Sequence, residues 1–171
     1  MYKVIGLFEN EQSAKSTVEE IKSKGISEER ISLVAKNNEA EDMEAGTQTQ
    51  TQTKTRRGNQ TDGIGDGIAT GGALGGIAGI LAGAGMLAIP GVGPILAAGP
   101  LAAGISGLAA GGIAGGLIDY GLDEEQGQRY AQEIERGRIL VAVEDEEETR
   151  IDDIAAMMEN RGAFEVETEL E

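Results

Sequence analysis

The stretch YKVIGLFENEQSAKSTVEEIKSKGISEERISLVAK, Tyr2–Lys36, has the pattern of a complete β-α-β unit. In Tyr2–Phe8, apolar residues fall on both alternating sets, which predicts a strand buried on both faces. Asn10 is a good helix N-cap, and Gly25 suits the left-handed position just beyond a helix end. The apolar run Ile31–Ala35 predicts a second strand. We therefore expect this stretch to be the first half of an α+β domain.

Residues 123–171 have a similar pattern. Asp123 with Gln126 three residues later forms a capping box, which predicts a helix that ends before the next strand. The apolar run Ile139–Val143 predicts that strand. A helix with apolar residues on one face then ends at Gly162, and a half-exposed strand of alternating Glu follows. This region therefore supplies a helix and the second half of the α+β domain.

The order β-α-β, an insertion, and β-α-β again predicts a ferredoxin-like sandwich. In that topology both halves join one antiparallel sheet, and two helices lie on one face of it. The strands near Ile31 and Ile139 would border the insertion. Such a fold assigns no activity by itself.

The insertion has two parts. Residues 37–62 are polar and include TQTQTQTKT, Thr47–Thr55. We expect a flexible linker there, with an edge strand as the less favoured alternative. Residues 63–122 predict a helical hairpin, because Gly67–Ile118 has no charged residue and IPGVGP at residues 89–94 has the composition of a turn. Each arm would exceed twenty residues and reach about 30 Å, enough to cross a bilayer.

Glycines at four-residue spacing characterise both arms. Each interior Gly costs a helix about 0.8 to 1 kcal/mol relative to Ala, so some close contact must offset that cost. Small residues in a row let two helix backbones touch, as in helix pairs within lipid. The predicted helix-packing interface consists of Gly63, Gly67, Gly71, Gly75, Gly79, Gly83, Gly99, Gly107, Gly111 and Gly115. A second row in the second arm contains Gly104, Gly112 and Gly116.

Two assemblies fit this hairpin. It could insert in or associate with a membrane and oligomerise through its glycines, with the α+β domain on the cytoplasmic side. Alternatively, hairpins from many chains could bury one another in a water-soluble ring, cage or filament. A wide aqueous pore is disfavoured because the arms offer only Thr70 and Ser106 as polar residues.

The composition argues against catalysis and nucleic-acid binding. There are 14 Lys and Arg against 30 Asp and Glu, a formal net charge of -16, whereas phosphate backbones require clustered cations. The chain contains no Cys and no His, so a thiol nucleophile, the commonest general base and the commonest metal ligand are missing. We expect no enzyme activity, cofactor or metal, and the sequence leaves a small-molecule ligand open.

Two local motifs also have plain explanations. GIGDGIATGG lacks the preceding strand and the Lys of a phosphate-binding loop. The acidic run Glu144–Glu148 lacks the spacing of a calcium loop, and we expect it to be a solvated turn that starts a helix. The opening MYKVIGLFENEQ lacks the features of a secretory signal, which favours the cytoplasm.

Residues 2–36, together with the glycine-rich insertion followed by YAQEIERGRILVAVE, resemble bacterial proteins of the general stress protein 17M-like family. The resemblance implies a stress-induced protein with no catalytic residues to carry over. The Thr/Gln tract departs from the family pattern.

Overall fold

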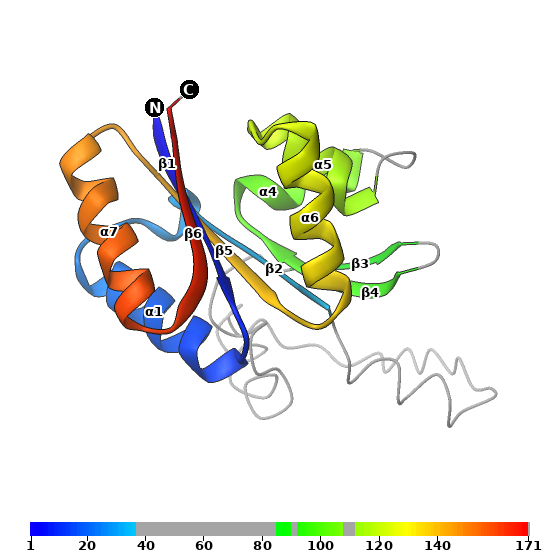
Figure 1. Cartoon of the computed structure of the whole chain (residues 1–171), viewed down its shortest axis with the longest axis horizontal. Helices are drawn as coiled ribbons and strands as arrows, with labels where there is room; N and C mark the ends of the chain where they lie inside the picture. The colour runs from blue at the N-terminus through cyan, green and yellow to red at the C-terminus, as the bar shows by residue number, and fades with distance from the viewer. Residues whose placement is uncertain (37–84, 90–91, 108–111, 171) are drawn as a thin grey trace, which may run out of the picture.

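The computed structural model describes residues 1–36, 85–89, 92–107 and 112–170. Within them the chain forms an α+β fold around a six-stranded antiparallel sheet of order β3-β4-β2-β5-β1-β6 (Figure 1). The strands are β1 (Tyr2–Phe8), β2 (Ile31–Lys36), β3 (Gly85–Ile89), β4 (Gly93–Ala98), β5 (Ile139–Asp145) and β6 (Ala163–Leu170). The helices are α1 (Glu11–Ser23), the 3-10 turn η1 (Glu28–Arg30), α4 (Pro100–Gly107), α5 (Gly112–Tyr120), α6 (Glu124–Glu135) and α7 (Glu148–Asn160).

The two predicted β-α-β units are present and share the sheet. β1-α1-β2 and β5-α7-β6 interleave so that the four strands lie in the order β6-β1-β5-β2. The predicted border of the insertion is confirmed, because Ile31 lies opposite Val143 and Ala35 lies opposite Ile139. The two chain ends meet where Tyr2 pairs with Leu170, as Figure 1 shows.

Helices cover both faces of the sheet. α1 and α7 lie on one side, and α4, α5 and α6 lie on the other (Figure 1). β1 divides its side chains between the two cores: Val4 and Phe8 join the first, and Ile5 and Leu7 join the second. All four are buried, which confirms the prediction of a strand buried on both faces.

The predicted helix ends are confirmed where the structure describes them. The Asn10 side chain accepts a hydrogen bond from Ser13 N at 2.8 Å, and Asp123 and Gln126 form the capping box. Gly25 and Gly162 adopt positive φ after α1 and α7. These local signals fix the lengths of the elements that carry the core.

The helical hairpin predicted for residues 63–122 is wrong in its described part. The end of the first arm is a strand, β3, and the second arm is a strand and two short helices, β4, α4 and α5. In the second arm the physical reason lies in Pro100, which lacks the N–H that a continuous helix needs. Gly99, with φ of 77°, turns the chain from β4 into α4. β4 then pairs with the free edge of β2, Leu33 opposite Ala98.

Other predictions lie outside the described residues. These are the linker 37–62 with its Thr/Gln tract, and Gly63, Gly67, Gly71, Gly75, Gly79, Gly83 and Gly111 of the predicted interface.

Candidate functional site

Among the described helices, close contacts at glycine occur within the layer of α4, α5 and α6. α4 and α5 come from the predicted second arm, and α6 follows them directly. Their apolar residues form one core with the second face of the sheet, including Leu101, Ile113, Leu117, Tyr130 and Ile134. The glycine-rich second arm is therefore part of the folded domain.

Gly104 and Gly116 place the backbones of α4 and α5 against each other. A β-carbon at Gly104 would lie 3.3 Å from the Gly116 carbonyl oxygen. A β-carbon at Gly116 would lie 2.5 Å from Ile105 Cγ1 and 2.9 Å from Ile105 Cα and N. Because real β-carbons do not approach backbone atoms so closely, only Gly fits at position 116 without displacing α4.

Gly127 makes the equivalent contact between α5 and α6. A β-carbon there would lie 2.9 Å from Ile118 Cγ1 and 3.2 Å from the Ala114 carbonyl oxygen. Its signal in the sequence was its place on the buried face of α6, with Tyr130, Ala131 and Ile134. The glycine row did not include it because it lies beyond the uncharged stretch.

The predicted interface glycines of the second arm have different places. Gly99 lies outside any helix, where an added β-carbon would overlap the carbonyl oxygen of Ile31. Gly107 is the last residue of α4, and Gly115 lies half-buried in α5. The close helix contact instead uses Gly104 and Gly116, which belong to the second row. This contact lies between two described helices of one chain, and the predicted interface through the other glycines stays a prediction.

A buried lysine ties this layer to the sheet. Lys3 of β1 is 5% exposed, and its Nζ donates a hydrogen bond of 2.6 Å to the Tyr120 carbonyl oxygen. The same ammonium lies 4.5 Å from the centre of the Tyr120 ring. On the neighbouring strands Lys3 lies opposite Glu144 and Glu169, so opposite charges flank it on both sides.

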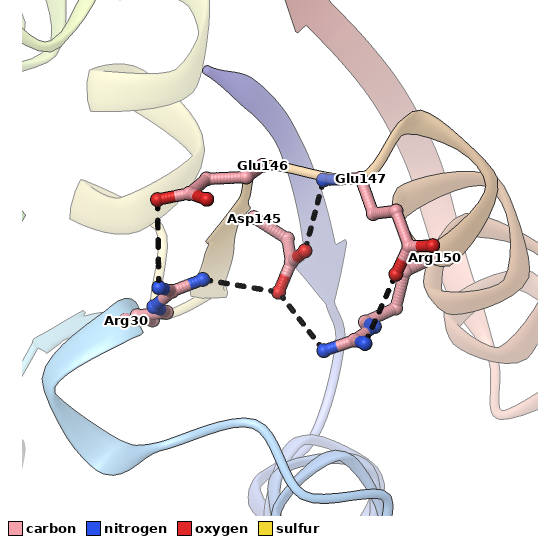
Figure 2. A network of polar contacts seen from close by, with 5 residues as sticks. All are labelled: Arg30, Asp145, Glu146, Glu147 and Arg150. Carbon is pink, nitrogen blue, oxygen red and sulfur yellow. Dashed lines mark hydrogen bonds and ion pairs between the residues drawn. The ribbon is translucent and has the colours of Figure 1, made fainter.

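A second buried charge, Asp145, lies opposite Tyr2 at the same end of the sheet, within a network of ion pairs (Figure 2). Its carboxylate oxygen Oδ2 lies 3.2 Å from Arg30 Nη1 and 3.4 Å from Arg150 Nη1. Oδ1 accepts a hydrogen bond of 3.0 Å from Glu147 N at the start of α7. Glu146 and Glu147 also pair with these arginines, at 3.9 and 3.0 Å. The network links η1, β5 and α7.

The prediction of a solvated turn that starts a helix is confirmed for residues 146–148, which are exposed and lead into α7, and is wrong for Asp145, which is buried. The Asp145 side chain is 4% exposed, whereas those of Arg30 and Arg150 are 41% and 47% exposed. Three carboxylates share two guanidinium groups, so no excess of positive charge is present to hold an anion. The arrangement is suited to structural support of the α7 N-terminus.

A third polar cluster joins α6 to the edge strand β6. Arg129 Nη2 lies 2.7 Å from Glu165 Oε1 and 3.0 Å from Glu167 Oε1, and Gln126 Nε2 donates to Glu167 Oε2 at 2.8 Å. The Tyr130 hydroxyl is buried and makes no hydrogen bond within the described part of the chain. Burial, followed by the charges of Glu167 and Glu165, raises the pKa of Tyr130.

The described residues contain no group of three or more acidic side chains placed to hold a metal ion. None of the described helices has the length and apolar character needed to cross a bilayer. No protein-family model, curated protein or solved structure matches this chain.

Proposed function

We propose that this chain is a non-enzymatic structural protein that self-associates through the glycine row of residues 63–83, carried by the α+β domain. We further propose that β6-β1-β5-β2 with α1 and α7 is a ferredoxin-like unit. Its strand order and its two β-α-β connections support that assignment.

The observation that carries the proposal is the place of the second arm. Gly104 and Gly116 make their close contacts with each other's helices inside one domain. These two glycines are therefore engaged within the chain, which favours the row from Gly63 to Gly83 for contacts between copies. In a helix, that row would let two backbones approach closely.

The ends of the connecting segment favour protein contacts over membrane insertion. Lys36 ends β2 and Gly85 begins β3, and both strands pair with β4 in one sheet. A segment that leaves and re-enters one sheet must cross a bilayer an even number of times. The uncharged residues 67–84 would reach about 27 Å as a helix. Two crossings need about 40 apolar residues, so this segment is too short for a spanning hairpin.

We propose that the protein acts in a stress response, because residues 2–36 resemble general stress protein 17M-like proteins. Within such a setting an acidic, self-associating protein would act by forming an assembly. No catalytic step is proposed for it.

The test is sedimentation velocity of the full chain, with and without a nonionic detergent. We expect a discrete oligomer under both conditions. The double variant Gly75→Leu/Gly79→Leu should reduce it to monomer, because bulky side chains prevent close approach of the backbones. The matched control Thr70→Leu/Ala73→Leu places the same bulk on the opposite side of a helix turning about 100° per residue.

Circular dichroism of each variant should match the parent chain, so that loss of the oligomer is not loss of the fold. A monomeric parent chain would overturn the proposal, as would an oligomer that survives Gly75→Leu/Gly79→Leu. Dependence of solubility on detergent, or carbonate-resistant pelleting with membranes, would establish membrane insertion instead.

A further inference from the structure

The outer edge of β6 is a second surface available for contact. β6 is the last strand of the sheet and, among the described strands, pairs only with β1 (Figure 1). An edge strand presents N–H and C=O groups that can form a ladder with another extended chain. β6 runs for eight residues, Ala163–Leu170, which is long for an edge.

Carboxylates alternate along one side of this strand. Glu165, Glu167 and Glu169 lie opposite Leu7, Ile5 and Lys3 of β1, and therefore share the face that carries α4, α5 and α6. The Glu165 and Glu167 side chains are 26% and 28% exposed. Arg129 pairs with both, and Lys3 lies opposite Glu169, so three carboxylates face two cations and one negative charge remains in excess.

The other side of β6 offers an apolar group. Phe164 is 47% exposed, one of the few large apolar side chains at the surface of the described residues. Arg138 lies 5.2 Å from the centre of its ring. Val166 lies opposite Gly6, is half-buried and packs on the core under α1 and α7, whereas Phe164 lies where the β1–β6 register is irregular. An added strand would therefore meet apolar surface on one face and carboxylates on the other.

This charge pattern selects the partner. Two β6 strands related by a two-fold axis through the sheet would place Glu opposite Glu, because antiparallel pairing keeps like faces together. The edge is thus protected against a second copy of itself. A strand with Lys or Arg at every second position would instead place each cation beside a carboxylate.

We propose that the β6 edge binds an extended segment of a partner polypeptide in which basic residues alternate with apolar or β-branched ones. The peptide ladder supplies affinity, and the row of Glu165, Glu167 and Glu169 selects the basic sequence. This surface is separate from the glycine row and does not depend on it.

The test uses a labelled peptide, acetyl-TKVKVKT-amide, titrated into the full chain and followed by fluorescence anisotropy at low salt. We expect saturable binding, weakened about threefold to tenfold in Glu165→Gln/Glu167→Gln, because exposed ion pairs contribute modestly. Gln retains the shape and an acceptor oxygen. The control Glu11→Gln/Glu19→Gln removes the same charge from exposed positions of α1 and should bind as the parent chain does.

A second peptide separates strand addition from simple charge attraction. N-methylation of alternate amides keeps the positive charge of the peptide but removes the N–H donors from one of its two edges. Two peptides are made, each methylated on a different edge. Only the peptide methylated on the edge that faces β6 should lose binding. Equal binding of both methylated peptides would overturn the proposal in favour of nonspecific adhesion. Absence of binding by the unmodified peptide, or equal weakening by both double variants, would overturn it as well.

Discussion

At Gly116 the missing side chain allows α5 to lie directly on the backbone of α4. Lys3 of the sheet contacts the same helical layer, because its buried ammonium donates a hydrogen bond to the carbonyl oxygen of Tyr120 at the end of α5. Tyr130 is the third residue on which the layer depends, since its ring is fully buried under α6. Each contact is decided by one or two atoms, so single substitutions report on it.

Gly116→Ala should destabilise the domain by about 1 to 3 kcal/mol, since the new methyl group meets the Ile105 backbone. This loss includes the gain of about 1 kcal/mol that Ala brings to a helix. Gly104→Ala is the control, because its β-carbon would approach the Gly116 carbonyl oxygen only to 3.3 Å. Its free energy of unfolding should be close to that of the parent chain. Urea unfolding of both variants measures the difference. Equal stability of the two would contradict the close α4–α5 contact.

Tyr130 predicts a loss of stability at high pH. Burial raises its pKa above the ordinary value of 10.0, so the unfolded chain loses the proton first. The contribution of this group is complete below pH 10 and falls as the pH rises beyond it. Tyr130→Phe should remove that part of the decline and retain the buried ring. The free energy of unfolding is measured by urea unfolding between pH 8 and 11. An equal decline with pH in the parent chain and the variant would refute this prediction.

At the scale of elements, the helices and strands near both ends of the chain could be predicted from the sequence, whereas β3, β4, α4 and α5 could not. Asn10, Gly25 and Asp123 are local signals, and the helices they bound depend on nearby residues alone. β4 depends on pairing with β2, about 60 residues away in sequence, and its Gly and Ala content gives no clear period. The dipeptides Gly93–Pro94 and Gly99–Pro100 were the signals in the sequence that argued against a continuous helix in this region.

The candidate site divides in the same way. Four-residue glycine spacing predicts close contact between helix backbones, because that spacing places small residues on one side of a helix. It could not identify the partner helix, since the same row suits a neighbour in the same chain or in another. Gly127 and the Asp145 network depend on residues that only the folded sheet brings together.

The junction between β4 and α4 makes the element-scale prediction. Gly99→Ala should destabilise the domain by about 3 kcal/mol or more, because it combines a left-handed backbone with overlap against Ile31. Gly25→Ala is the matched control: its φ is also positive, but an added β-carbon meets open space, so about 1 kcal/mol is expected. Thermal unfolding distinguishes them, and similar losses would show that β4 does not lie against β2.

At the scale of the whole molecule, one sheet collects strands from both ends of the chain and from the end of the insertion. This arrangement makes β3, β4, α4 and α5 part of the domain, and we propose that the glycine row of 63–83 makes the contacts between copies. Domain stability and self-association should therefore be separable properties. Substitutions at Gly99 or Gly116 should affect the first, and those at Gly75 and Gly79 the second.

The most direct measurement is hydrogen exchange of the peptide covering residues 93–107, in the parent chain and in Gly75→Leu/Gly79→Leu. We predict that the β4 amides are protected as strongly as those of β5, and equally in both proteins, because β4 is held by β2 within one chain. Fast exchange of this peptide, or protection lost in the variant, would contradict the account. It would mean that the second arm is ordered only by assembly.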